Sequence, residues 1–227
     1  MSATSSHDAT SSHDATPSHD IIAQWSFAVT PGTTLADTTG RFDGVADGVF
    51  AAENGAAWHF PGDAAHVRVT HDPALDLVDG YTLEAVVRLD RIGNPRNKVG
   101  VQAILEKHIG KGGWLFVVEG EGRLHYWMET PDGRVEDTST VALEPNRWYH
   151  VAMTWDGAKT VFYVNGAPAG EKAFAGPLGR CPQDLYLGND DTKDWSWWGD
   201  IAEITITSGA LSAGEIAKNA AAAHTGK

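Results

Sequence analysis

The sequence predicts an all-β fold, a two-sheet antiparallel β-sandwich with a short C-terminal helix. From residue 21 onward, short runs rich in aromatic and β-branched residues alternate with turn signals that contain glycine or proline. The central pair of runs, 147–155 and 160–165, is joined by an Asp-Gly turn and reads as a β-hairpin. Neither face of this hairpin is polar enough for open water, so we expect it inside a layered structure rather than at its edge.

The length and composition of the chain predict a single acidic domain. At 227 residues, the chain is long enough for a single β-sandwich with a large buried core. With 17 Lys and Arg residues against 30 Asp and Glu residues, the net charge is −13. This charge argues against nucleic acid as a partner, and no apolar run is long enough for membrane insertion. Because Cys181 is the single cysteine, no intrachain disulfide can form and packing must stabilise the fold.

The chain opens with a low-complexity His-Asp repeat over residues 1–20, which we expect to form a flexible arm. Its three His-Asp pairs could alternatively hold a transition metal weakly or dock a partner subunit. The repeat lacks the basic and apolar regions of a secretory signal peptide, and the compartment stays unknown. The expected organisation is therefore an arm at 1–20, a sandwich at 21–218 and a tail at 219–227.

The expected strands follow from the same patterns. In chain order they are 21–27, 55–60, 65–70, 81–89, 101–108, 114–119, 123–129, 136–141, 147–155, 160–165, 184–188 and 199–207. Strand 81–89 alternates most clearly, with Leu83, Ala85 and Val87 on one face. Near the C-terminus, Ser212 and Glu215 form a capping box that predicts the start of the helix.

The run W-Y-H-V-A-M-T-W-D-G at 148–157, followed by F-Y-V-N-G at 162–166, resembles the central signature of laminin-G-like jelly rolls. These domains belong to the concanavalin A-like lectin/glucanase superfamily. The closing L-S-A-G-E-I at 211–216 is similar to the end of the same family, and the resemblance covers roughly residues 22–218. It implies a jelly-roll sandwich and relatives that are mostly extracellular. It leaves lectin, adhesion, hydrolase and lyase functions open.

The loop N-D-D-T-K-D-W-S-W-W-G-D at 189–200 is the first candidate for ligand contact. Tryptophan faces stack on sugar rings, while Asp side chains bind hydroxyl groups or a cation. We expect carbohydrate to contact Trp195, Trp197, Trp127, His125 and Asp190. The expected calcium ligands, if a cation binds, are Asp190, Asp191 and Asp194. The alternative is that a tryptophan plugs one end of the sandwich and the aspartates are solvated.

The resemblance also implies a structural calcium site in many relatives, which we expect this chain to lack. Many relatives carry an acidic pair after the first strand and an Asp in the closing strand. Here Ala28-Val29 and Ala202 stand at those positions. Joint loss of both sides is physically coherent, because one isolated buried carboxylate would be costly. If calcium binds at all, we expect it in the loop at 189–200.

A catalytic alternative rests on His125, Glu129 and His150. His125 and Glu129 share one face of strand 123–129, and His150 could lie on a neighbouring strand. No Glu-x-Asp-x-Glu segment supplies the paired carboxylates of a glycosidase. The favoured reading is a non-catalytic module that binds a carbohydrate or glycoconjugate. The alternatives are a glycan-cleaving enzyme on the same fold and an assembly protein that docks through residues 1–20.

Overall fold

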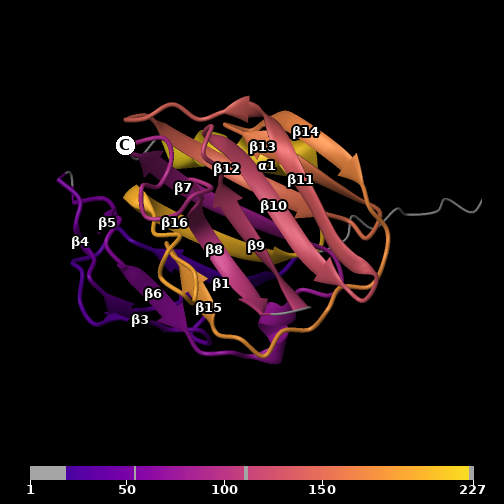
Figure 1. Cartoon of the computed structure of the whole chain (residues 1–227), viewed down its shortest axis with the longest axis horizontal. Coiled ribbons are helices and arrows are strands. Elements are labelled where there is room, and N and C mark those ends of the chain that lie inside the picture. Colours follow the sequence, from indigo (N-terminus) through magenta and orange to yellow (C-terminus); the bar gives the residue numbers. More distant parts are fainter. Residues whose placement is uncertain (1–18, 54, 110–111, 225–227) are drawn as a thin grey trace, which may run out of the picture.

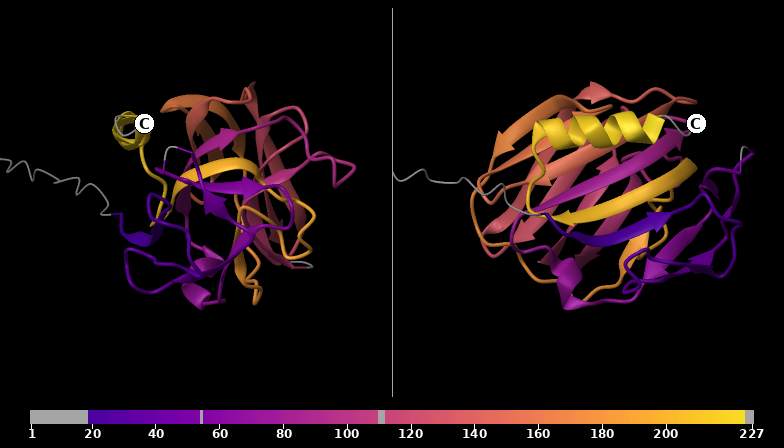
Figure 2. Two further views of the ribbon diagram at one scale, coloured as in Figure 1. Left: turned by 90° about the vertical axis from the view of Figure 1, so that its left-hand side faces the viewer. Right: turned by 180° about the vertical axis from the view of Figure 1, so that it is seen from behind.

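A computed structural model describes residues 19–53, 55–109 and 112–224 of the chain. Within these residues, two eight-stranded antiparallel sheets pack face to face and confirm the predicted β-sandwich (Figure 1). We name them sheet A and sheet B. Helix α1, Ala213–His224, lies across the outer face of sheet A, and strand β1, Ile21–Ser26, runs alongside β16 within that sheet (Figure 2). The expected arm at 1–20 lies outside the described residues except for His19 and Asp20.

Sheet A carries the predicted central hairpin in its interior. Its strand order is β14, Ala167–Ala173; β13, Lys159–Val164; β12, Trp148–Trp155; β7, Tyr81–Leu89; β16, Trp198–Ser208; β5, Trp58–Pro61; and β4, Phe50–Ala51. Strand β1 pairs with β16 outside this path. Hairpin strand β12 lies between β13 and β7, as the apolar character of both its faces predicts.

Sheet B forms the other layer. Its strand order is β11, Gly133–Ala142; β10, Arg123–Thr130; β9, Gly112–Val118; β8, Gln102–Ile109; β15, Leu185–Leu187; β6, His66–Val69; β3, Gly44–Asp47; and β2, Thr34–Leu35. A short 3₁₀ helix, Pro73–Asp76, follows β6. Strands β8, β9 and β10 form a continuous meander, and their outer face carries the candidate site.

The core lies between the two sheets and follows the period-two alternation of the strands. On β7, Leu83, Ala85 and Val87 are all buried in the main core, as their spacing predicts. Trp25 and Trp58 fill the same core and are fully buried. Burial of this apolar surface is the main source of stability, since the fold has no disulfide.

The C-terminal helix covers a patch of apolar side chains on the outer face of sheet A. Ile216 is fully buried and packs with Ala152 of β12 in a second apolar cluster. The predicted capping box is present: Glu215 N donates to Ser212 Oγ, and Ser212 N donates to Glu215 Oε2 at 2.8 Å. The helix then continues to His224.

Four strands are absent from the sequence-based prediction: β2, β3, β4 and β14. Strand β14 has the sequence A-P-A-G-E-K-A, which contains no β-branched or aromatic residue. It is extended because β13 offers it backbone partners, not because of its own propensity. Strands β2 and β4 have only two residues each, too few for a periodic pattern.

Candidate functional site

The outer face of sheet B carries a row of side chains that crosses three strands. The register pairs Glu106 of β8 with Leu115 of β9, and Leu115 with Trp127 of β10. Because side chains alternate along a strand, His125 and Glu129 lie on the same face as Trp127. The sequence-based placement of these three β10 residues on one face is therefore correct in register.

Two tryptophans meet on this face. Trp195, from the loop between β15 and β16, contacts Trp127 edge to face, with 5.4 Å between the ring centroids. Both rings are half-buried and pack on a small apolar cluster of Val101, Ala103, Leu115 and Val117. We call Trp127, Trp195, His125, His108 and Glu129 the Trp127–Trp195 surface. It presents aromatic rings beside polar groups without closing them into a deep cavity.

The loop that delivers Trp195 is held by its own side chains. Asp190 Oδ1 accepts hydrogen bonds from the backbone N–H groups of Asp194, at 2.8 Å, and Trp195, at 2.9 Å. Thr192 Oγ1 donates to the other carboxylate oxygen of Asp190. From the neighbouring loop, the buried Asn94 side chain donates to the carbonyl oxygens of Asp194 and Ser196. These bonds hold the Trp195 backbone in place over sheet B.

Charged and imidazole groups surround the aromatic pair. The His125 ring lies 5.8 Å from Trp127, and its Nδ1 is 2.9 Å from Thr138 Oγ1. Burial lowers the pKa of His125, although the carboxylate of Glu119 opposes this effect. Arg134 stacks its guanidinium over Trp127 at 3.9 Å and donates to Glu129 at 2.7 Å. Thus Glu129 is already paired with a cation.

Glu106 is the most perturbed carboxyl group on this face. It is 2% exposed, and within the described residues its Oε2 has no hydrogen-bond partner. Burial, followed by the charges of Asp191 and Asp190, raises its pKa to about 9. Glu106 is therefore a neutral acid at pH 7, beneath the loop that carries Trp195.

The structure corrects one expected ligand contact. Trp197 is fully buried in the main core, and its backbone N–H donates to the carbonyl of Gly188 at 2.9 Å. Its side chain packs in the core between the two sheets. The ring of Trp197 is therefore unavailable to a ligand, and only Trp195 of the two remains on the surface.

The three aspartates expected to bind calcium differ in their surroundings. Asp190 uses both carboxylate oxygens to hold its own loop, and Asp191 accepts from Gln183 Nε2 at 2.9 Å. Asp194 is exposed. In the part of the chain that the structure describes, no three or more His, Cys, Asp or Glu residues are grouped to hold a metal ion.

The proposed catalytic set does not converge. His150 belongs to β12 of sheet A, whereas His125 and Glu129 belong to β10 of sheet B. His150 Nε2 lies 3.0 Å from Glu84 on β7, under helix α1. The expectation that His150 could lie beside β10 is wrong, because the two strands belong to different layers.

Sequence reasoning did not single out Glu106, His108 or Arg134 as members of the site. Period-two alternation along β8 could have predicted that Glu106 and His108 lie on the same outer face. The stacking of Arg134 on Trp127 depends on the hairpin register of β10 and β11, which pairs Glu129 with Arg134. That register includes an irregularity between Arg123 and His125, so spacing alone could not supply it.

Solved structures show the same fold at low sequence identity. The binding domain of Paraclostridial Mosquitocidal Protein 1 has a TM-score of 0.69 and 12% identity, over 88% of this chain and 51% of that chain. The Botulinum Neurotoxin Type G receptor binding domain has a TM-score of 0.67 and 14% identity, over 89% and 51%. The botulinum neurotoxin serotype D binding domain has a TM-score of 0.68 and 14% identity, over 89% and 51%. The chain therefore spans about half the length of these structures.

No curated protein matches the chain. Among the described residues, no helix is long and apolar enough to cross a membrane. A laminin-G family model, described as the concanavalin A-like lectin/glucanases superfamily, matches residues 61–217. This match includes the central hairpin and most of both sheets, and the chain belongs to that superfamily.

Proposed function

We propose that this protein is a non-catalytic binding module that recognises carbohydrate through the Trp127–Trp195 surface. The observation that carries the proposal is the half-buried Trp127–Trp195 pair, set among imidazole and carboxyl groups on one sheet face. Indole rings offer apolar faces that stack on the faces of sugar rings. Neighbouring polar side chains can then select the positions of hydroxyl groups.

The polar groups of this surface suit binding better than catalysis. Glu129 is paired with Arg134, and burial lowers the pKa of His125. Retaining glycosidases need two carboxyl groups about 5–5.5 Å apart, one of them a nucleophile. Here the neutral Glu106 and the ion-paired Glu129 lie on different strands, β8 and β10. A glycan-cleaving role is therefore the weaker proposal.

The structural neighbours support a binding role for a domain of this fold. Each is named as a binding domain, and one is named as a receptor binding domain. By analogy we infer that this chain also binds a partner, with an extracellular glycoconjugate as the expected class. An assembly role for residues 1–20 stays a separate prediction, because the arm lies outside the described residues apart from His19 and Asp20.

The test is a titration of the full chain with a panel of oligosaccharides, followed by tryptophan fluorescence and isothermal titration calorimetry. A bound sugar should change the emission of Trp127 and Trp195, and either Trp127→Ala or Trp195→Ala should lower affinity about tenfold or more. The rough size assumes loss of one aromatic contact worth about 1–3 kcal/mol.

The matched control is Trp148→Ala, a half-buried tryptophan on sheet A. It should leave glycan affinity unchanged while removing a fluorophore of the same kind. Thermal unfolding of each variant separates loss of binding from loss of fold. The proposal is overturned if no oligosaccharide gives a saturable signal, or if Trp148→Ala weakens binding as much as the two sheet B variants.

A further inference from the structure

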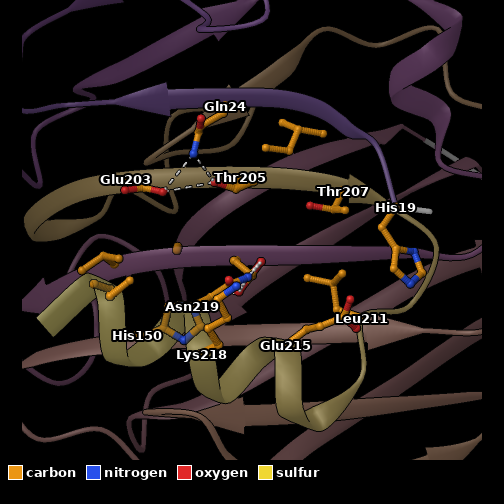
Figure 3. Close-up of a pocket in the computed structure, with 16 residues that line it drawn as sticks. His19, Gln24, His150, Glu203, Thr205, Thr207, Leu211, Glu215, Lys218 and Asn219 are labelled. Carbon is orange, nitrogen blue, oxygen red and sulfur yellow. Dashed lines mark hydrogen bonds and ion pairs between the residues drawn. The ribbon is translucent and has the colours of Figure 1, made fainter. Parts of the chain in front are cut away.

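A second candidate site lies on the opposite side of the sandwich. A cavity of about 710 Å³ opens between helix α1 and strand β1, above the outer face of β7 and β16 (Figure 3). Small-molecule sites commonly have volumes of about 300–1,000 Å³. The Trp127–Trp195 surface is on sheet B, so this cavity is independent of it.

Three carboxylates line the cavity, and two of them, Glu84 and Glu203, lie on the strands beneath it, β7 and β16. Glu84 is buried, and its oxygens accept from Asn219 Nδ2 at 3.2 and 3.1 Å and from His150 Nε2 at 3.0 Å. Glu203 is half-buried and accepts from Gln24 Nε2 at 3.1 Å. Across the described ranges, Glu84 is paired with His150 at 3.0 Å, and neither carboxylate forms an ion pair with a lysine or arginine. Amide donors satisfy hydrogen bonds but do not neutralise the charge.

His150 adds an unused acceptor to the same cavity. It is 3% exposed and lines the cavity, and its Nδ1 has no hydrogen-bond partner among the residues described. A neutral imidazole that donates from Nε2 to Glu84 leaves Nδ1 with a lone pair. The cavity thus combines two carboxylates with a buried acceptor that has no donor.

We propose that this cavity binds a small organic cation that carries a primary ammonium group. An ammonium group supplies three N–H donors and one positive charge, which complements Glu84, Glu203 and His150 Nδ1. The apolar side chains of Val86 and Leu211 line the same cavity and can contact the carbon skeleton of the ligand. Lys218 and Glu215 of α1 also line the cavity; their charges are opposite, so together they add no net charge to it. A divalent metal is a poorer fit, since no three suitable ligands are grouped in the described residues.

The experiment titrates the full chain with pentylamine, which is protonated at pH 7, and with 1-pentanol as the neutral probe of similar length. Calorimetry should show saturable 1:1 binding of pentylamine and no comparable binding of 1-pentanol. Glu203→Gln should weaken pentylamine binding about tenfold or more, because a hydrogen bond to a charged group is lost. Added salt should also weaken the binding of pentylamine to the unmodified chain, because it screens the attraction between the charges.

Glu121→Gln is the matched control, since Glu121 is exposed in the β9–β10 turn and far from the cavity in the fold. It makes the same change in net charge and should leave pentylamine affinity unchanged. Glu84→Gln should also weaken binding; if this buried variant fails to fold, Glu203→Gln still decides. Equal binding of 1-pentanol, equal effects of Glu203→Gln and Glu121→Gln, or no saturable binding would overturn the proposal.

Discussion

The indole rings of Trp127 and Trp195 meet at an interplanar angle of 86°, with their centroids 5.4 Å apart. Trp127 is fixed on strand β10, whereas Trp195 is delivered by a loop. Edge-to-face aromatic pairs contribute about 0.5–1.5 kcal/mol beyond the area that they bury. This contact therefore links the position of the loop to the face of sheet B.

The first prediction concerns the coupling between these two rings. In a double-mutant cycle of Trp127→Ala and Trp195→Ala, the free energies of unfolding should show an interaction of about 0.5–1.5 kcal/mol. Urea unfolding followed by circular dichroism measures it. A cycle of Trp127→Ala with Trp148→Ala should give no interaction, because Trp148 is on sheet A. Additive effects in the first cycle would show that the rings do not support one another.

The second prediction separates two aspartates that the sequence treats alike. Asp190→Ala should lower the free energy of unfolding by about 1–3 kcal/mol, because it leaves the N–H groups of Asp194 and Trp195 without their acceptor. Asp194→Ala is the matched control, and should change it by less than about 0.5 kcal/mol because this side chain is exposed. Equal losses in the two variants would contradict the assigned role of Asp190.

Local alternation was enough to predict which side chains of a strand face the core. On β7, burial of Leu83, Ala85 and Val87 follows directly from the period of a strand, and the bounds Tyr81–Leu89 agree with the predicted range. The capping box at Ser212 predicted the start of α1 in the same way. These features are determined by residues that are close together in the sequence, so the sequence alone is enough to predict them.

The candidate site was only partly predictable, because it depends on contacts distant in sequence. Trp195 and Trp197 lie in one loop without periodicity, and only the docking of that loop sends Trp197 into the core and Trp195 onto sheet B. Likewise, the strands of His125 and His150 look equivalent in sequence, yet they belong to different sheets. Sheet assignment is a property of topology, which residue patterns do not encode locally.

The third prediction concerns Glu106, whose pKa is raised to about 9 by burial and by the charges of Asp191 and Asp190. In the unfolded chain this group ionises near its ordinary value, about 4.3. Between these two values the native state keeps a proton that the unfolded state releases, so the free energy of unfolding falls as pH rises.

Replacement of Glu106 by Gln should remove this penalty, since glutamine is a neutral isostere of the protonated acid. We expect Glu106→Gln to raise the free energy of unfolding at pH 7 by about 1–3 kcal/mol and to flatten its decline between pH 5 and 8. Chemical unfolding at several pH values measures both. The exposed Glu121→Gln is the control, and a loss of stability in Glu106→Gln at pH 7 would show that Glu106 is ionised in the native state.

The fourth prediction concerns His59 of β5 and Asp200 of β16. His59 Nδ1 lies 2.8 Å from Asp200 Oδ1, and this hydrogen bond is the main cause that raises the pKa of His59. Burial opposes it, while the more distant charge of Asp90 adds to it. A raised pKa means that protonated His59 stabilises the fold below about pH 6.5, and that this stability is lost as pH rises through the raised value.

Titration of the His59 imidazole by NMR should therefore give a pKa above that of a free histidine. Asp200→Asn should lower this pKa more than Asp90→Asn does, because the mutated carboxylate accepts the hydrogen bond directly. Arg88 also pairs with Asp200, so Asp200→Asn should in addition lower the free energy of unfolding. His59→Gln should flatten the fall in stability that begins near pH 6.5, about the pKa of an unfolded histidine, without this second loss. An unchanged His59 pKa in Asp200→Asn would exclude the assigned hydrogen bond as the cause of the shift.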